Sequence, residues 1–483
     1  MATSFDFDFG VIGGGAAGLT AASGASQLGA KVLLIEREAA LGGDCLHFGC
    51  VPSKTLIRSA HVYHMMHQAE RFGLPQPELP PVDFSRVAKR IREVQAEIQK
   101  HDSVERFCSL GVQVEFGPAQ FVDPHTVDVA GKKYTAKSWL IATGSESSSP
   151  AIPGLESVPY LTNKEIFSLE SLPESMIVLG GGAIACEIAQ AFSRLGCSVT
   201  ILQRSPQLFS QQDSDMALLV QQVLESEGVT VHTGVSIQCI EEVDGQCRVF
   251  YQTQDGAGHE CEAAQLFLGL GRAPVMDALE LHNAGVEVSR RGITVDSRMR
   301  TSQKHIFAAG DVTGAPQFTH AAGYEGGIVV SNAIFRVPRK ADYTNLPWCT
   351  FTSPEFAGIG LNEGQARKQL SGVECIEEQF SANDRALAEG ELQGKLKLVL
   401  SKGKPVGVQI VGPHAGELLC EWVPVQAGGV KLSTLAGAIH PYPTLAEINK
   451  KAAGSFISPK IFSPRVVGVL STLFSYRGRA CGK

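Results

Sequence analysis

The chain has 483 residues, which is too long for one hydrophobic core and predicts two to four domains. A hydrophobic content of 44%, a charged content of 19% and 51 glycines are typical of a soluble α/β protein. The net charge of −7 without a basic stripe argues against nucleic acid as a partner, and the 12 irregularly spaced cysteines do not resemble a secreted disulfide framework. With no visible signal peptide and no apolar run of membrane-spanning length, the sequence predicts a cytoplasmic protein.

The N-terminus carries the pattern of a strand–helix–strand unit. Residues 5–12 predict a strand, residues 13–18 form a Gly-x-Gly-x-x-Gly turn that opens a helix, and residues 31–35 predict a second strand. Glycines in such a turn let the backbone approach a pyrophosphate at the helix N-terminus. Glu36 closes the second strand, where a carboxylate suits a ribose hydroxyl. The unit therefore predicts a dinucleotide site.

A cysteine pair follows in the segment 42–54, which reads GGDCLHFGCVPSK. A straight helix would separate Cys45 and Cys50 by about 7.5 Å along its axis, whereas the Cα atoms of a disulfide lie about 5.5–6 Å apart. We therefore expect a distorted backbone at Gly49 and a new helix that begins near Cys50, with Pro52 in its first turn. A thiolate at a helix N-terminus has a lowered pKa, which suits a redox pair.

The strand–helix–strand pattern recurs in the middle of the chain. Residues 176–179 predict a strand, residues 180–185 repeat the glycine turn with Ala185 as its last member, a helix runs through Leu195, and residues 198–202 predict another strand. A second dinucleotide site is therefore predicted, and two nucleotides with a dithiol suggest an electron relay. Gln203 and Arg204 stand where an NAD site usually has an acid, which slightly favours NADPH over NADH; the alternative is that Arg204 points to solvent.

Together these motifs resemble the class I pyridine nucleotide-disulfide oxidoreductases, the family of dihydrolipoamide dehydrogenase, glutathione reductase and mercuric reductase. The resemblance covers about residues 5–451, and residues 317–320 and 440–444 are most similar to mercuric-reductase-like members. It implies FAD, NADPH or NADH, and a homodimer. The implied fold is α/β, with two doubly wound Rossmann-like nucleotide-binding domains and an α+β dimerisation domain. The predicted FAD-binding domain comprises residues 1–150 and 275–345, and the predicted NAD(P)-binding domain comprises residues 151–274. Residues 346–460 are the predicted interface domain, and residues 461–483 are a basic, apolar tail.

The resemblance also assigns residues to the two cofactors. Those expected to hold FAD are Gly13, Gly15, Gly18, Glu36, Ala119, Thr143, Gly144, Ser145 and Asp311, with Asp311 on the ribityl chain. Those expected around the nicotinamide nucleotide are Gly180, Gly182, Glu187, Gln203, Arg204 and Gly271. No resident metal site is predicted.

The resemblance gives the catalytic residues distinct roles. Cys50 would be the thiolate that exchanges electrons with the flavin, and Cys45 the interchange thiol that attacks the acceptor. Lys54 and Glu187 match a family ion pair beside the flavin ring, where a cation supports negative charge after hydride transfer. The loop of Tyr442 would complete the dithiol site of the other subunit.

The sequence departs from the disulfide reductases of the family at one catalytic position. Those enzymes have a histidine five residues before a glutamate, but the residue five before Glu447 is Tyr442, and the nearby His440 is seven before it. A phenol is a poor base at neutral pH, although it can donate a hydrogen bond or contact a metal thiolate. Mercuric reductases resemble the chain here, but they end in a vicinal cysteine pair, whereas this chain has only Cys481.

Three functions therefore stay open. The first is reduction of a soft metal ion such as Hg(II), and the second is dihydrolipoamide dehydrogenase-like reduction of a disulfide, with His440 or a partner residue as the base. The third is a flavoprotein redox sensor with residual diaphorase activity, which an intact Lys54, Glu187 and cysteine pair argue against. The tail could contact an anionic membrane surface or a partner, or pack on its own protein.

Overall fold

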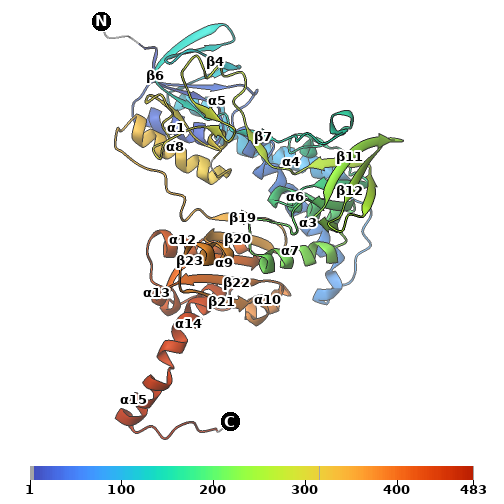
Figure 1. The fold of residues 1–483 in the computed structure, drawn as a ribbon, viewed down its shortest axis with the longest axis vertical. Helices are drawn as coiled ribbons and strands as arrows, with labels where there is room; N and C mark the ends of the chain where they lie inside the picture. The colour runs from blue at the N-terminus through green and yellow to red at the C-terminus, as the bar shows by residue number, and fades with distance from the viewer. Residues whose placement is uncertain (1–4, 315, 482–483) are drawn as a thin grey trace. The chain divides into compact units, whose positions relative to one another are not determined.

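The computed structural model describes residues 5–314 and 316–481 and divides the chain into two compact units. One unit comprises Met1–Leu208 with Glu225–Tyr343, and the other comprises Phe209–Leu224 with Thr344–Lys483. Residues 1–4 and 315 of the predicted FAD-binding domain, and 482–483 of the predicted tail, lie outside the described residues. Both units combine helices with sheets, which confirms the α/β fold class (Figure 1).

The largest sheet of the first unit has the order β3-β2-β1-β6-β5-β4, with β18 beside β6. Helices α1 (Ala16–Gln27) and α8 (Thr319–Ala333) pack against each other and cover one face of this sheet (Figure 1). Its central strands are apolar on both faces, as buried parallel strands require. The parallel strands are β1 (Phe7–Ile12), β2 (Val32–Glu36), β3 (Val112–Phe116), β6 (Lys132–Ile141) and β18 (Ile306–Ala308), and the antiparallel ones are β4 (Ala119–Asp123) and β5 (Thr126–Val129).

A second parallel sheet of the same unit has the order β10-β9-β8-β14. Its strands are β8 (Ser175–Leu179), β9 (Ser198–Gln203), β10 (Thr230–Thr233) and β14 (Gln265–Leu268), and helix α6 (Ala183–Leu195) connects β8 to β9. The strand–helix–strand unit predicted for residues 176–202 is thereby confirmed. Smaller antiparallel sheets consist of β11 (Ser236–Val243), β12 (Gln246–Gln252) and β13 (Gly258–Ala263), of β7 (Ser145–Ser147) with β15 (Arg272–Pro274), and of β16 (Val288–Ser289) with β17 (Gly292–Ile293).

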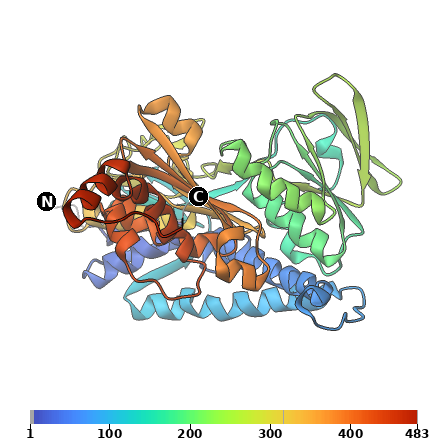
Figure 2. The same cartoon turned by 90° about the horizontal axis from the view of Figure 1, so that it is seen from below.

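The cysteine segment lies on two consecutive helices, α2 (Gly43–His47) and α3 (Cys50–His67). Helix α3 packs against α6 and against α4 (Phe84–Gln99), and Figure 2 shows α3 and α4 side by side in two shades of blue. The short helix α5 (Val104–Ser109) follows and leads into β3. These contacts fix the position of α3, whose first residue is the exposed Cys50.

The second unit is built on an antiparallel sheet of order β19-β20-β23-β22-β21. The strands are β19 (Trp348–Thr350), β20 (Glu355–Gly360), β21 (Val373–Gln379), β22 (Lys395–Ser401) and β23 (Lys404–Gly412). Its helices are α7 (Ser214–Ser226), α9 (Glu363–Gln369), α10 (Asp384–Glu389), α11 (Ala415–Leu419), α12 (Trp422–Ala427), α13 (Leu432–Gly437), α14 (Glu447–Ile461) and α15 (Pro464–Phe474). The predicted division into three domains stays a prediction, and α7, which lies in the predicted NAD(P) range, packs in this unit.

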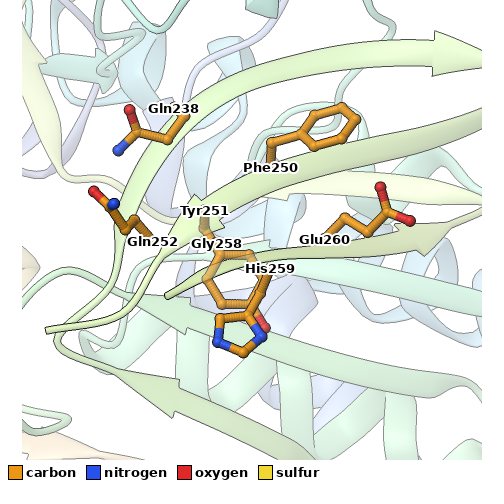
Figure 3. A pocket seen from close by; sticks show the side chains of 7 residues that line it. All are labelled: Gln238, Phe250, Tyr251, Gln252, Gly258, His259 and Glu260. Carbon is orange, nitrogen blue, oxygen red and sulfur yellow. The ribbon is translucent and has the colours of Figure 1, made fainter. Parts of the chain in front are cut away.

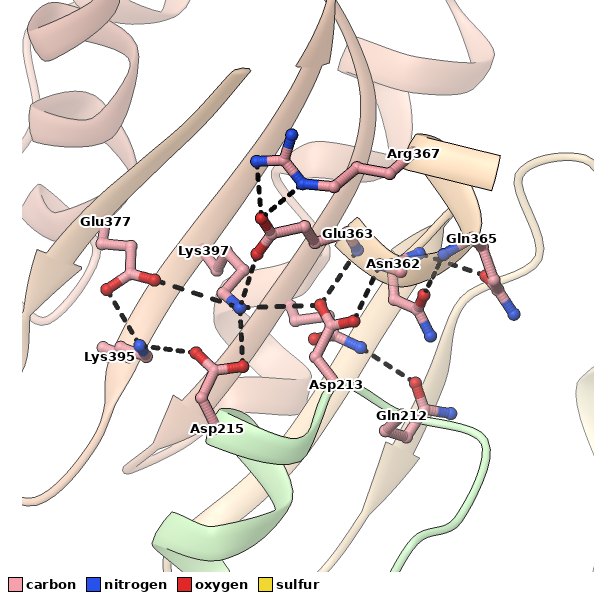
Figure 4. A network of polar contacts seen from close by, with 12 residues as sticks. Gln212, Asp213, Asp215, Asn362, Glu363, Gln365, Arg367, Glu377, Lys395 and Lys397 are labelled. Atoms are coloured by element: carbon pink, nitrogen blue, oxygen red, sulfur yellow. Dashed lines mark hydrogen bonds and ion pairs between the residues drawn. The ribbon is translucent and has the colours of Figure 1, made fainter. Parts of the chain in front are cut away.

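A buried charge network joins α7 to this sheet (Figure 4). Lys397 of β22 is only 2% exposed, and its Nζ lies 2.7 Å from Asp215 Oδ1 and 3.1 Å from Glu363 Oε2. Asp213 is a third carboxylate at 3.6 Å, and Lys395 also binds Asp215 at 2.7 Å. Burial by itself lowers the pKa of Lys397, but the hydrogen bonds to carboxylates outweigh it and the pKa is raised. The lysine is therefore charged and holds acids from two elements together.

We expect the substitution Lys397→Met to lower the free energy of unfolding by about 3 kcal/mol, because it removes a buried cation and leaves Asp213 and the partly exposed Asp215 and Glu363 without their shared partner. The effect should lie at the low end of the usual range, since Lys395 stays beside Asp215. Lys404→Met is the matched control, because Lys404 is an exposed lysine on the neighbouring strand. The measurement is guanidinium-induced unfolding, and equal midpoints for the two variants would contradict the role given to the network.

Candidate active site

The backbone between the two cysteines breaks the helix where the sequence predicts it. Cys45 lies in α2, Cys50 is the first residue of α3, and Gly49 between them adopts φ −128° and ψ −117°. A Cβ atom added to Gly49 would lie 2.9 Å from the carbonyl oxygen of Asp44 and 3.2 Å from the Cα atom of Cys45. Only glycine fits this close approach. The predicted distortion and the predicted start of the second helix are therefore confirmed.

The two thiols have opposite protonation preferences. The pKa of Cys50 is lowered to about 6, chiefly by a hydrogen bond from the Cys45 thiol; desolvation opposes this effect, and the charge of Lys54 supports it. The pKa of Cys45 is raised far above its usual value, because the same hydrogen bond and burial both favour its protonated form. Thr319 Oγ1 lies 3.7 Å from Cys50 Sγ. At neutral pH the pair therefore carries its negative charge on Cys50 and its proton on Cys45.

Lys54 and Glu187 form the ion pair that the sequence predicts. Lys54 Nζ donates to Glu187 Oε2 at 2.6 Å, and this contact joins the first turns of α3 to α6. The Glu187 side chain is 5% exposed, so its carboxylate holds Lys54 in a fixed place, one helical turn after Cys50. The pair places a positive charge near Cys50, where it favours the thiolate.

Arg272 is a site residue that the sequence reasoning missed. Its Nε and Nη2 donate to the side-chain and carbonyl oxygens of Ser145, both at 2.7 Å, and Nη2 lies 3.1 Å from Asp44 Oδ2. Asn163 holds the same helix, since its Nδ2 donates to Asp44 Oδ1 and to the Phe48 carbonyl, both at 3.0 Å. Arg272 and Asn163 thus fix α2, which carries Cys45. The signal in the sequence was an arginine directly after Gly271, at the end of an apolar strand.

Asp311 lies on the same network. Ser145 Oγ donates to Asp311 Oδ2 at 2.5 Å, and Arg272 Nε lies 3.8 Å from that oxygen. Burial raises the pKa of Asp311, while Ser145 and Arg272 oppose the rise. The preceding Gly310 has φ +77° and donates its N–H to the fully buried Glu325 at 2.6 Å. The structure therefore brings the predicted residues Ser145 and Asp311 together.

The first glycine turn has the form of a dinucleotide cradle. Gly13 has φ +108°, and a Cβ atom there would lie 2.3 Å from the Ala142 carbonyl oxygen; a Cβ atom on Gly18 would lie 1.9 Å from the Gly13 carbonyl oxygen. Gly15 caps α1 without a side-chain hydrogen bond, so the amides of the first turn face outward. Glu36 accepts the Gly14 N–H at 2.7 Å. These residues fit a pyrophosphate with its adjoining ribose.

The remaining residues assigned to FAD lie on neighbouring strand ends. Thr143 Oγ1 donates to the Val275 carbonyl at 2.7 Å, Gly144 has φ +71°, and the buried Ala119 is the first residue of β4. Thr143 and Gly144 directly follow β6, which is parallel to β1, so they lie at the carboxyl edge of the sheet that also bears the first glycine turn.

The second glycine turn has the geometry of the first, but the residue at the end of the following strand is different. Gly180 has φ +111° and a Cβ atom on it would lie 2.4 Å from the Gly269 carbonyl oxygen, while Gly182 caps α6 and faces open space. Gln203 packs beside Gly181, where Glu36 packs beside Gly14 in the first turn. Arg204 is exposed directly after β9, and Gly271 has φ +102°. The second turn thus fits a nucleotide and has no acid at the ribose position.

In the second unit, Tyr442 is held by Asp384 and not by Glu447. The Tyr442 hydroxyl donates to Asp384 Oδ2 at 2.9 Å, and this hydrogen bond raises the pKa of the phenol. Glu447 Oε2 instead accepts the Thr444 N–H at 3.4 Å. Asn383 also contacts this loop, because its Nδ2 donates to the Thr444 carbonyl at 3.3 Å. Tyr442 remains 70% exposed and presents a protonated phenol.

His440 is not available to replace the missing histidine within this chain. Its side chain is 7% exposed, with Nε2 2.8 Å from Glu421 Oε1 and Nδ1 3.3 Å from the Ala438 carbonyl oxygen. Glu421 also accepts Asn449 Nδ2 at 2.9 Å. Both ring nitrogens of His440 therefore face acceptors inside the unit.

A shallow depression of about 390 Å³ lies elsewhere, on the antiparallel sheet of β11, β12 and β13 (Figure 3). Its lining includes Tyr251, His259 and Glu260 and none of the predicted site residues. Within residues 5–314 and 316–481, no group of three or more His, Cys, Asp and Glu side chains is arranged to hold a metal ion. In the same residues, no helix combines the length and apolarity needed to cross a membrane.

Comparisons with known proteins show the family that the chain resembles. Residues 7–326 match the family described as pyridine nucleotide-disulphide oxidoreductase, and residues 346–453 match its dimerisation domain. The chain is 36% identical to a mercuric reductase of Bacillus cereus, over 94% of this chain and 72% of that protein. It is 35% identical to a dihydrolipoyl dehydrogenase of Bacillus subtilis (strain 168), over 92% and 98% of the two chains. The solved Cu(II) complex of the HOCl-induced flavoprotein disulfide reductase RclA from Escherichia coli matches with a TM-score of 0.83 and 27% identity, over 92% and 99%.

Proposed function

The chain belongs to the pyridine nucleotide-disulphide oxidoreductase family, whose members use FAD and NAD(P)H, and on that premise we propose that its acceptor is a soft metal ion such as Hg(II). The observation that carries the proposal is the environment of Tyr442. A protonated phenol stands where disulfide reductases have a histidine base, and His440 is only 7% exposed with both ring nitrogens on acceptors of its own unit. A thiophilic metal ion needs thiolate ligands and no proton from a base.

The residues of the first unit would hold the cofactors as the sequence predicts. Gly13, Gly15, Gly18 and Glu36 would bind the ADP half of FAD, and Ser145 and Asp311 would bind nearer the ring. When bound, FAD accepts a hydride from the nicotinamide and passes two electrons onward. Lys54, oriented by Glu187, would stabilise negative charge on the flavin. The intact ion pair and thiol pair argue against the redox-sensor alternative, since a sensor would not need this complete relay.

The cysteine pair handles two electrons in a balanced cycle. The Cys45–Cys50 disulfide takes up two electrons and one proton and becomes a Cys50 thiolate and a Cys45 thiol, the form that the pKa values favour. Hg(II) then takes two electrons from this pair, the S–S bond forms again, and one proton is released. The metal ion is the substrate of the reaction and leaves as Hg(0).

Reduction of a disulfide is the second candidate, favoured by the likeness to the dihydrolipoyl dehydrogenase. It requires a general acid/base beside Cys45, which the described residues of one chain do not supply through His440. We also propose NADPH as the donor, since Gln203 and the exposed Arg204 replace an acid at the second strand end.

The matched dimerisation domain supports a homodimer, and we propose that Tyr442 of one subunit completes the dithiol site of the other. We further propose a cytoplasmic location, where thiols are kept reduced between turnovers.

Turnover of the purified flavoenzyme with competing acceptors tests the proposed function. With NADPH as donor, we expect Hg(II) to be reduced at least roughly 100-fold faster than lipoamide or oxidised glutathione. Reduction of these disulfides needs a general acid, which the site does not supply. Stopped-flow absorbance of NADPH under anaerobic conditions gives the rates. Equal or faster turnover of lipoamide would overturn the metal-ion proposal and leave the disulfide candidate.

A further inference from the structure

The last helix of the described chain, α15, presents an apolar face that no part of its own unit covers. None of its residues is buried, and Leu473, Phe474 and the preceding Phe462 are among the most exposed apolar side chains of the protein. Ser463 caps the helix by accepting the Val466 N–H at 3.4 Å, and Pro464 occupies its first turn. The helix is therefore a locally specified element, and Figure 1 shows it following α14 at the end of the second unit.

The apolar residues of this segment are gathered on one side. At about 100° per residue they fall within an arc of roughly 160°, and Arg465, Gly468, Ser471 and Thr472 lie on the opposite side. An apolar stripe of this width with a short polar face is typical of a helix that lies in an interface plane. The residues of the stripe are Val466, Val467, Val469, Leu470, Leu473 and Phe474.

The charge of the same region is opposite to that of the rest of the protein. None of the chain's 49 acidic residues lies after Glu447, whereas seven of its 42 lysines and arginines do. Among these, Lys460, Arg465, Arg477 and Arg479 flank or lie on α15 and are exposed. In a chain with a net charge of −7, this is the region suited to an anionic surface.

We propose that α15 and its flanking basic residues bind the surface of an anionic lipid membrane. The apolar face would enter the boundary of the acyl chains, and the four basic side chains would meet the headgroups. A second copy of the chain fits less well, because a two-fold contact between these segments would bring like charges together. In addition, the family's dimerisation domain ends at residue 453, before α15 begins. A nucleic acid would leave the apolar face uncovered.

Flotation of the full-length flavoenzyme with lipid vesicles tests the proposal. We expect binding to vesicles of phosphatidylcholine mixed with phosphatidylglycerol to be roughly tenfold or more tighter than to pure phosphatidylcholine, and to weaken as salt is raised. Val469→Glu/Leu473→Glu, on the apolar face, should abolish binding. The matched control is Ser471→Glu/Thr472→Glu, which adds the same charge on the polar face. This variant should retain most of the vesicle binding.

Three results would overturn the proposal. The first is absence of binding to the anionic vesicles, or an equal loss in both double variants. The second is conversion of the apolar-face variant to monomers in light scattering, since this would show that a second copy covers the face. The third is a loss of NADPH turnover by this variant without vesicles, since the face would then pack on the enzyme itself. A fall in vesicle binding with unchanged turnover supports the proposal, whatever the identity of the electron acceptor.

Discussion

Replacing Cys50 by serine is expected to lower the rate of Hg(II) reduction at least about 10³-fold, the scale on which loss of a nucleophile disables a catalytic unit. Reduction of the bound flavin by NADPH should continue, because the glycine turns and the Lys54–Glu187 pair remain. Flavin reduction reports electron transfer from NADPH to the flavin, and Hg(II) reduction reports the later transfer to the acceptor. The two rates therefore separate the two steps, since Cys50 takes part only in the second. Both are measured by stopped-flow absorbance.

The protonation of Cys50 predicts how the spectrum changes with pH. A thiolate next to oxidised flavin gives a long-wavelength absorbance band, and with a pKa of about 6 this band should be full above pH 7 and fall as the pH drops through 6. The direction follows from the charge: the pKa of the thiol is lowered, so the charged form persists to lower pH. Cys50→Ser should lack the band at every pH.

Variants of Cys45 test the main cause of the lowered pKa. Cys45→Ser keeps a hydrogen-bond donor and should leave the midpoint of the band near pH 6, whereas Cys45→Ala removes the donor and should raise the midpoint. Both variants should lose Hg(II) reduction, because the pair can no longer form a disulfide. Hg(II)-dependent oxidation of NADPH that survives Cys45→Ser would show that the cysteine pair is not the route of the electrons.

The substitution Tyr442→His is expected to raise lipoamide reduction about 100-fold, since general acid–base catalysis typically contributes ~10²–10⁴-fold. An imidazole at this position would have a carboxylate close by, because Asp384 already accepts the hydroxyl of Tyr442 at 2.9 Å. Hg(II) reduction should not rise in the same variant. Initial rates with both acceptors under identical NADPH concentrations provide the comparison.

Two further variants serve as controls for this substitution. Tyr442→Phe removes the hydroxyl without adding a base, so its lipoamide rate should stay low. Asp384→Asn combined with Tyr442→His should lose part of the gain, because the imidazole then lacks the carboxylate that orients it. If Tyr442→His shows no gain, or if Tyr442→Phe gains as much, a missing base does not limit disulfide reduction by this enzyme.

The local patterns of the sequence were sufficient for the cofactor turns and for the cysteine pair. Gly13 and Gly180 need a positive φ and a close approach of the backbone, and only glycine permits both. Each turn can therefore be predicted from one short segment of the sequence. The break at Gly49 follows in the same way from the spacing of Cys45 and Cys50. Each of these features depends on the geometry of a few consecutive residues.

Partners that are remote in the sequence could not be predicted in this way. Asp384 precedes Tyr442 by 58 residues, and Arg272 meets Ser145 across 127 residues. Such contacts depend on which strand ends and loops the packing brings together. Nor does the sequence alone indicate that α7 packs in the second unit. This packing involves the contact of Asp215 with Lys397, and the sequence does not distinguish this buried lysine from a surface lysine.

The sequence by itself therefore determined the residues proposed to receive electrons, which are the two nucleotide turns, the Cys45–Cys50 pair and the Lys54–Glu187 ion pair. Only the tertiary structure decided which of the two thiols carries the charge, which carboxylate holds Tyr442 and that His440 is engaged elsewhere. The physical reason is that a pKa and a hydrogen bond depend on distances between groups from different elements. A motif records only the residues that are neighbours along the chain.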